Sequence, residues 1–407
     1  MDVKSLLQRI DLRDRRTAYI ALTAPVVAYT GYRLLGTLLS PWNRNPSNII
    51  ASPRQSLQLL SAQNLEDLPY PPNALPGARD IDTPYGNIRA YEWGPEDGRK
   101  VLFVHGISTP CIAFAGMAKM LVEQGCRVML FDLFGRGYSD APKLDQDIQL
   151  FSSQILSVLT SSKLAWTGTS RFTMIGYSLG GGVSAAFTSY FPDMVESLVL
   201  VAPAGLLRPD HISTSSKLVY GNLLPQSLVN YYVGRRLRSR PTASAASGNP
   251  ETTGAAKAAE SEVPHPAHAA DSKAPIFPER PRISPANAVA WQVDAHPGFL
   301  PSFVSSIKHA PIANQHDRWR LIGSRQAAQR ASAEPEKAQG LEEGKVLVLL
   351  GKQDNVIIAS EVEEDGTKAL GKENVKMVKL EGAHDLPIVN AKGCVDAINE
   401  FWSTGSS

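Results

Sequence analysis

Continuous runs of apolar residues punctuate the chain, and most of them end in glycine and polar residues. Runs that are apolar at every position are typical of strands buried on both faces, as in a parallel sheet. Four such runs stand at residues 101–104, 128–131, 198–201 and 346–350. A fifth, at 375–380, alternates apolar and polar positions, which also indicates a strand. We therefore predict a series of buried strands, each followed by a turn.

The first 45 residues have a different pattern. Residues 17–32 carry no charge, and after Arg33 a second uncharged run covers 34–42. Together they approach the roughly 20 residues that cross a bilayer. Three interpretations of segment 1–45 stay open: a membrane anchor that acts through residues 17–42, a helix packed on the protein's own surface, and a targeting peptide. We predict a membrane-associated protein, for instance at the endoplasmic reticulum, with the cytoplasm as the alternative location.

Residues 171–182 read RFTMIGYSLGGG, an apolar strand that runs into a glycine-rich turn and a small-residue helix start. A serine at such a turn is held in a strained backbone conformation, so the residues two places before and after it must be nearly free of side chain. Gly176 and Gly180 meet that need around Ser178, which the pattern predicts to be a nucleophile. The competing interpretation is that Ser178 only caps the helix.

Two further turns supply the partners that a nucleophilic serine needs. Such a serine requires a base, and the base requires an orienting carboxylate. Asp354 and His384 each follow one of the predicted strands, and the order serine, aspartate, histidine is the one found with this kind of elbow. We predict Ser178, Asp354 and His384 as the catalytic residues, with Asp210 as the alternative acid.

Five motifs follow the predicted strands: HGIS at 105–108, DLFGRGYSD at 132–140, GYSLGGG at 176–182, GKQD at 351–354 and GAHDLP at 382–387. Together they make residues 81–402 resemble the α/β-hydrolase superfamily, and within it the cap-bearing serine esterases, monoacylglycerol lipases and carbon–carbon bond hydrolases. The resemblance implies an α/β fold, a mostly parallel eight-stranded sheet with helices on both faces and a helical cap insertion. Relatives that open epoxides or cleave carbon–halogen bonds use an aspartate at the elbow, so Ser178 argues against those reactions.

The resemblance also implies where an oxyanion would be bound. One donor is the amide after the nucleophile, and the second comes from the loop after an upstream strand, here the HGIS motif. We predict the amides of Leu179 and Ile107 as the oxyanion hole, with Ser108 as the alternative to Ile107.

Three polar residues near these motifs are interpreted as structural. His105 is expected to pin its own loop, because His384 already fills the role of general base. Asp132 and Arg136 are expected to tie the turn after residues 128–131 without taking part in proton transfer.

A long insertion separates the run at 198–201 from the run at 346–350, where the superfamily usually has a single helix. Within it, residues 216–236 and 291–312 look helical and apolar enough to roof a pocket. Between them, residues 241–285 have almost no large apolar side chain, so we predict disorder there. The predicted domains are the N-terminal segment 1–45, a hydrolase core made of 75–205 and 340–403, and a cap insertion at 206–330.

Composition narrows the classes of partner. A chain of 407 residues can hold one large α/β domain with insertions. The net charge of +2, without a clustered basic motif, argues against a nucleic-acid partner. Three scattered cysteines are too few for a disulfide framework or a metal site, and no metal-ligand spacing or phosphate-binding loop is present in the sequence. We predict no metal and no cofactor. The cysteines are Cys111, Cys126 and Cys394.

These observations predict a serine hydrolase that cleaves a carboxylic ester, of a lipid or a secondary metabolite, through an acyl-enzyme. The predicted partner is a small acyl-bearing molecule, while the substrate-binding residues and the oligomeric state stay open. Aromatic residues in the insertion suggest a hydrophobic acyl group: Tyr231, Tyr232, Trp291, Phe299 and Phe303. The alternatives are an acyltransferase or thioesterase, a carbon–carbon bond hydrolase, and a non-enzymatic receptor for small molecules on the same fold.

Overall fold

The computed structural model describes residues 23–24, 27–32, 48–57, 59–208, 224–238, 273–334, 339–342 and 344–405. The chain divides into two units, Met1–Asn48 and Ile49–Ser407. In the first unit, residues 23–24 and 27–32 are helical, and the rest of the predicted anchor at 17–42 lies outside the described residues. No helix in the described ranges is both long and apolar enough to cross a membrane.

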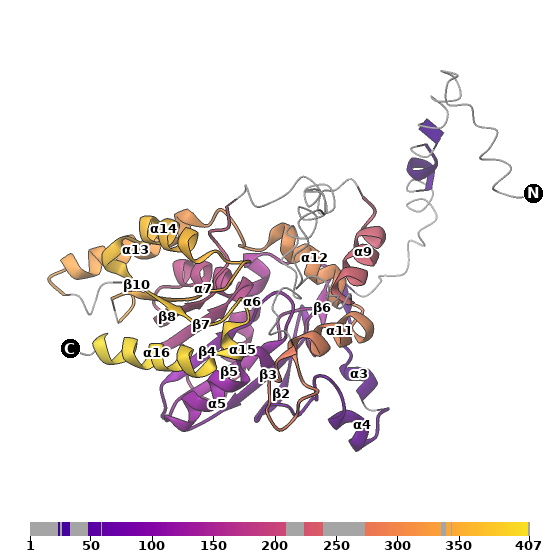
Figure 1. The fold of residues 1–407 in the computed structure, drawn as a ribbon, viewed down its shortest axis with the longest axis horizontal. Helices are drawn as coiled ribbons and strands as arrows, with labels where there is room; N and C mark the ends of the chain where they lie inside the picture. Colours follow the sequence, from indigo (N-terminus) through magenta and orange to yellow (C-terminus); the bar gives the residue numbers. More distant parts are fainter. Residues whose placement is uncertain are drawn as a thin grey trace, which may run out of the picture. The chain divides into compact units, whose positions relative to one another are not determined.

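An eight-stranded sheet forms the centre of the second unit (Figure 1). Its strand order is β10-β9-β8-β7-β4-β5-β3-β2, and only the pairs that involve β3 are antiparallel. The predicted mostly parallel sheet is therefore confirmed. The strands are β2 (Ala78–Thr83), β3 (Gly86–Trp93), β4 (Lys100–Val104), β5 (Arg127–Phe131), β7 (Phe172–Tyr177), β8 (Val195–Val201), β9 (Val346–Gly351) and β10 (Val375–Leu380).

The apolar runs of the sequence became the central strands. Strands β7 and β9 are buried at every position, and β4, β5 and β8 at nearly every position, because helices cover both faces of the sheet. Strand β10 lies at the edge of the sheet and is only half-buried, which accounts for its alternating pattern. Since parallel strands all end on the same side of the sheet, the turns after β4, β7, β9 and β10 share one edge.

Two layers of helices cover the sheet (Figure 1). On one face α5 (Ala115–Glu123) contacts α16 (Ala391–Gly405). On the other, α7 (Leu179–Tyr190) contacts α6 (Ile148–Thr160) and α13 (His316–Ala331), which in turn contacts α14 (Ala359–Leu370). The remaining short elements are β1 (Ile49–Ile50), β6 (Ala141–Pro142), α3 (Arg54–Leu57), α4 (Ala62–Glu66), η1 (Cys111–Phe114), η6 (Lys372–Asn374) and α15 (Leu386–Val389).

The core begins earlier than the predicted residue 75. Strand β1 pairs with β6, and Tyr70 is fully buried with its hydroxyl donating to Asp132. The sequence before residue 75 shows no periodic apolar pattern, so a single buried aromatic residue such as Tyr70 gave no signal of its own.

Three helices of the insertion pack around a second apolar cluster: α9 (Gln226–Arg238), α11 (Pro285–Ala295) and α12 (Phe299–His309). The predicted helix at 291–312 is thus two helices, broken at His296 and Gly298. Tyr231 and Tyr232 of α9 are exposed rather than turned into this cluster. We call these helices the cap and the cluster the cap cluster; its buried members are Val229, Val233, Val289, Val293, Phe299, Phe303 and Val304.

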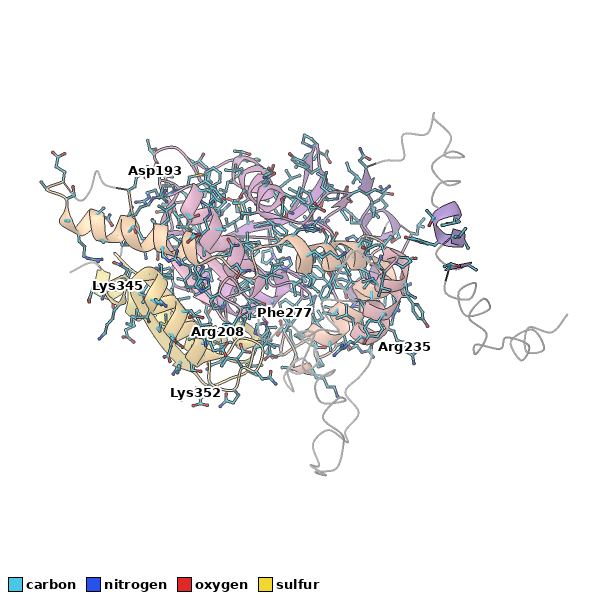
Figure 2. The ribbon with its side chains drawn as sticks, turned by 90° about the horizontal axis from the view of Figure 1, so that it is seen from above. Asp193, Arg208, Arg235, Phe277, Lys345 and Lys352 are labelled. Atoms are coloured by element: carbon cyan, nitrogen blue, oxygen red, sulfur yellow. The ribbon has the colours of Figure 1, made fainter. Side chains whose placement is uncertain are left out.

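Helix α13 lies outside the cap, although the prediction placed residues up to 330 within it. Its Trp319 and Ile322 are buried in the main core, so the cap ends before α13. At the start of the insertion, Arg208, labelled in Figure 2, forms ion pairs with Glu364 and Asp365 of α14. These contacts connect this end of the insertion to the main unit.

The predicted disorder at 241–285 is wrong for its last part. Residues 273–285 are described and bury Ile276 and Ile283, while Phe277, labelled in Figure 2, packs against the main core. Residues 241–272 lie outside the described ranges. A few apolar residues spaced along a polar segment were enough to hold 273–285 on the core.

Candidate active site

Ser178 stands between β7 and α7 in a backbone conformation that few non-glycine residues adopt, with φ 53° and ψ −120°. Such a conformation costs on the order of 1–3 kcal/mol and persists only where the surroundings hold it. Here the Ser178 amide donates to Val201 O at 3.1 Å, and its carbonyl accepts from the amides of Gly181 and Ala204. The strained turn predicted from the sequence is therefore present.

The glycines around Ser178 are required by close backbone packing. A Cβ on Gly180 would lie 2.6 Å from His105 O and closer still to Val104 O, and a Cβ on Gly176 would lie 2.7 Å from the carbonyl carbon of Gly180. These distances are too short for any side chain, so the first turn of α7 can approach β4 and β7 only with glycine at both positions.

The structure brings Ser178, His384 and Asp354 into one hydrogen-bonded row. Ser178 Oγ lies 3.0 Å from His384 Nε2, and His384 Nδ1 lies 2.9 Å from Asp354 Oδ2. A carboxylate only accepts hydrogen bonds, so we assign the ring proton to Nδ1, which leaves Nε2 to accept from the serine hydroxyl. The alternative acid, Asp210, lies outside the described residues.

The surroundings of Asp354 fix its carboxylate. Its side chain has no exposed surface, and its second oxygen, Oδ1, accepts the amides of Val356 and Ile357 at 2.8 and 2.9 Å. The turn that carries His384 lies directly on the end of β9, since a Cβ on Gly351 would lie 2.6 Å from Ala383 O. The two turns are thereby held in register beside Ser178.

Tyr177 flanks the imidazole of His384, with ring centroids 5.4 Å apart, and is almost fully buried. Tyr177 is not among the site residues predicted from the sequence. Its position immediately before the elbow serine, at the end of a buried strand, was the available signal.

Two backbone amides near Ser178 suit an oxyanion. The amide of Leu179, at the first position of α7, and the amide of Ile107 donate to no protein acceptor in the ranges that the structure describes. The loop of Ile107 lies close, because a Cβ on Gly106 would be 3.3 Å from Ser178 Cβ. The loop that carries Ile107 thus lies beside the serine, and the assignment of the two amides as oxyanion donors stays a prediction.

His105 and Asp132 are structural, as predicted. His105 is fully buried, contacts Gly106 O through Nδ1 and accepts the Leu133 amide at Nε2. Burial and the charge of Arg136 lower its pKa to about 3, so the ring is neutral near pH 7. Asp132 accepts the amides of Cys111 and Tyr138 and so ties two turns together.

Arg136 donates to Phe134 O within the predicted turn. It also has partners outside that turn, which the sequence did not predict. It donates to Ile107 O beside the site and to Ser306 Oγ of the cap. Gln292 of α11, which is not among the predicted site residues, donates to Ser108 O. An amide side chain within a helical pattern carries no signal of such a role.

The described residues contain no group of His, Cys, Asp or Glu side chains that could hold a metal ion. All three cysteines are buried and unpaired by disulfides. The absence of a metal and a cofactor stays a prediction.

Comparison with known proteins identifies the family of the chain. The family described as the alpha/beta hydrolase fold matches residues 100–390. The chain therefore belongs to the α/β-hydrolase family, and the predicted resemblance is confirmed.

Individual relatives are more distant. The chain is similar to the serine hydrolase-like protein of Danio rerio (34% identical over 31% of this chain and 38% of that protein) and to its Homo sapiens namesake (33% identical over 34% and 69%). It thus spans well under half the length of the zebrafish relative. The crystal structure of a membrane phospholipase A, described as a bacterial virulence factor, has a TM-score of 0.53 at 16% identity, over 97% of this chain and 99% of that one. That likeness shows the fold alone.

Proposed function

We propose that the protein is a serine hydrolase that cleaves carboxylic esters through an acyl-enzyme, with Ser178, His384 and Asp354 as its catalytic residues. The observation that carries the proposal is the hydrogen-bonded row from Ser178 Oγ through His384 to the buried Asp354. The amides of Leu179 and Ile107, which donate to no protein acceptor within the described residues, give the proposal further support.

In the proposed reaction, His384 Nε2 takes the proton of Ser178 as its Oγ attacks the acyl carbonyl carbon. Asp354 stabilises the resulting imidazolium through Nδ1–H and keeps the ring in the tautomer that the serine needs. The carbonyl oxygen, now negative, accepts from the amides of Leu179 and Ile107, and each such donor is worth about 3 kcal/mol in the transition state.

The second half of the reaction repeats these roles. Collapse of the tetrahedral intermediate breaks the ester bond, and the leaving alcohol takes the proton from His384. A water molecule then gives its proton to His384 and attacks the acyl-enzyme, which releases the carboxylic acid and restores Ser178.

The apolar surroundings support an ester with a hydrophobic acyl group. The side chain of Ile107 packs against both the main core and the cap cluster, and every member of that cluster is uncharged. An acyl chain that covered the half-buried side chain of Ile107 would gain about 25 cal/mol for each Å² of apolar surface removed from water.

A panel of neutral esters with acyl chains of graded length tests the proposal. Wild type should hydrolyse at least one of them, and Ser178→Ala should lower kcat by about a million-fold without unfolding the protein. Ser403→Ala, at an exposed serine of α16, should leave kcat unchanged. The proposal fails if Ser178→Ala stays within about tenfold of wild type on every ester that the protein hydrolyses.

A further inference from the structure

We propose that Gln292 and Arg136 are positioning residues through which the cap sets the geometry of the oxyanion loop, residues 106–109. This inference rests on the proposed function, because it gives that loop a part in the same reaction. Neither residue touches the reacting atoms. Their action is on the peptide groups that follow the predicted donor.

Hydrogen bonds to the loop's carbonyl groups fix the directions of its amides. In a trans peptide the N–H points opposite to the C=O of the preceding residue. Gly106 O is in contact with His105 Nδ1 at 2.7 Å, so the amide of Ile107 points the other way, away from the buried ring. By the same rule, the side chains that donate to Ile107 O and Ser108 O fix the directions of the amides of Ser108 and Thr109.

Both of those anchors lead to the cap. Arg136 Nε donates to Ile107 O at 3.1 Å, and its Nη2 donates to Ser306 Oγ at 2.7 Å and to Ser302 O at 3.4 Å, both on α12. Gln292 is itself a residue of α11, and its Nε2 donates to Ser108 O at 2.9 Å. Side chains therefore bind three consecutive carbonyls of the loop, those of Gly106, Ile107 and Ser108. The side chains that bind the last two belong to a cap helix or contact one.

Gln292 also forms a hydrogen bond with the turn that carries Arg136. Its Oε1 accepts the amide of Gly137 at 2.8 Å, so one buried side chain bridges the oxyanion loop and the turn after β5. Helix α12 contacts the same turn closely, because a Cβ on Gly135 would overlap Ser302. A displacement of the cap would therefore move both anchors of the loop together.

Arg136 connects the oxyanion loop to the cap although its burial is energetically costly. The side chain is fully buried, it has no carboxylate partner within the described ranges, and burial lowers its pKa to about 9. Removing a charged group from water without a counter-ion is costly. The five hydrogen bonds of its guanidinium offset part of that cost, and they tie together the oxyanion loop, the turn after β5 and α12.

Gln292→Met is the informative variant, because it keeps the side-chain volume and removes the hydrogen bonds to Ser108 O and from the Gly137 amide, together with a longer one within α11 to Ala288 O. The chain offers a matched control in Gln326 of α13, which is equally buried and bridges the N–H and C=O of Leu341. Gln326 lies beside Thr188, near the end of α7 opposite to Ser178. A purely structural role predicts that the two variants behave alike.

For Gln292→Met we expect kcat on a neutral ester to fall about tenfold, with KM within about twofold of wild type. The inhibition constant of a trifluoromethyl ketone analogue, which forms the tetrahedral adduct, should rise by the same factor as kcat falls. Ser306→Ala removes one cap contact of Arg136. It should also lower kcat and raise the inhibition constant, each by a smaller factor than Gln292→Met does. Gln326→Met should lose a similar amount of thermal stability and keep both quantities within about twofold.

Amide hydrogen exchange supplies a readout that does not depend on activity. Exchange in residues 106–109 should be faster in Gln292→Met than in wild type, and unchanged in Gln326→Met. Equal kinetic constants and equal exchange in the two variants would overturn the inference while leaving the proposed function intact. If wild type hydrolyses no ester, the proposed function fails, and the exchange of residues 106–109 alone decides whether the cap holds the loop.

Discussion

Replacing Gly180 by alanine tests whether the close approach of α7 to β4 sets the site. The new Cβ would lie 2.6 Å from His105 O and closer still to Val104 O, whereas non-bonded heavy atoms prefer roughly 3.5–4.0 Å. Both neighbours are backbone atoms between the central strand β4 and its loop, so they cannot move aside as a side chain would. The start of α7 must therefore shift by on the order of 1 Å.

That shift carries Ser178 and the amide of Leu179 with it. A misplacement of about 1 Å costs on the order of a hundredfold in rate, so kcat for the best ester should fall by about that factor. Overpacking should cost about 1–3 kcal/mol of unfolding free energy, partly offset by the better helix propensity of alanine, about 1 kcal/mol.

The assay compares kcat by steady-state kinetics with stability by thermal or urea unfolding. Gly366→Ala in α14 is the control, because its Cβ would come within 3 Å of one atom alone, the flexible end of Met377 at 2.9 Å, and would lie at ordinary contact distances from Trp319 and Leu206. This control should keep kcat and lose no stability. If folded Gly180→Ala retains kcat within about twofold of wild type, the reasoning that backbone packing positions the nucleophile is refuted.

Three further predictions concern the carboxylate of the site, the buried histidines and the N-terminal segment. Asp354→Asn should lower kcat by about 10⁴-fold, since the amide would favour the wrong tautomer of His384, and its circular dichroism spectrum should match wild type. Burial lowers the pKa of His296 to about 4 and, with the charge of Arg136, that of His105 to about 3. Between about pH 4 and 6.5 only the unfolded chain therefore takes up these two protons. Each histidine should lower the free energy of unfolding by about 1.4 kcal/mol per unit as the pH falls from 6.5 toward 4, and urea titrations should find the slope reduced by about that amount in His296→Gln. The anchor interpretation of residues 1–45 predicts that full-length protein sediments with membranes and that a form lacking these residues does not; equal partition of the two forms would refute that interpretation.

The strands and the three proposed catalytic residues could be predicted from sequence because each is signalled locally. A run such as 346–350 can be buried on both faces only as a central strand, and Ser178, Asp354 and His384 each follow such a strand. Glycines at 176 and 180 marked the elbow, since close backbone packing leaves no other residue type.

The connections between distant segments could not be predicted in the same way. Gln292 and Ser108 are 184 positions apart, and a glutamine in a helix carries no sign of its partner. The boundary of the cap was missed because α13 has few apolar residues and still buries Trp319 in the main core. Likewise, Tyr70 joins the core as a single residue, without a surrounding pattern.

Reaction with a fluorophosphonate, followed by mass spectrometry of the labelled peptides, tests most directly whether Ser178 is an activated nucleophile. The hydrogen-bonded row of Ser178, His384 and Asp354 predicts rapid, stoichiometric modification of Ser178 in wild type. The modification should be lost in His384→Ala, and other serines should stay unlabelled in both proteins. Folded protein that leaves Ser178 unmodified, or that reacts equally fast without the imidazole, would contradict the account.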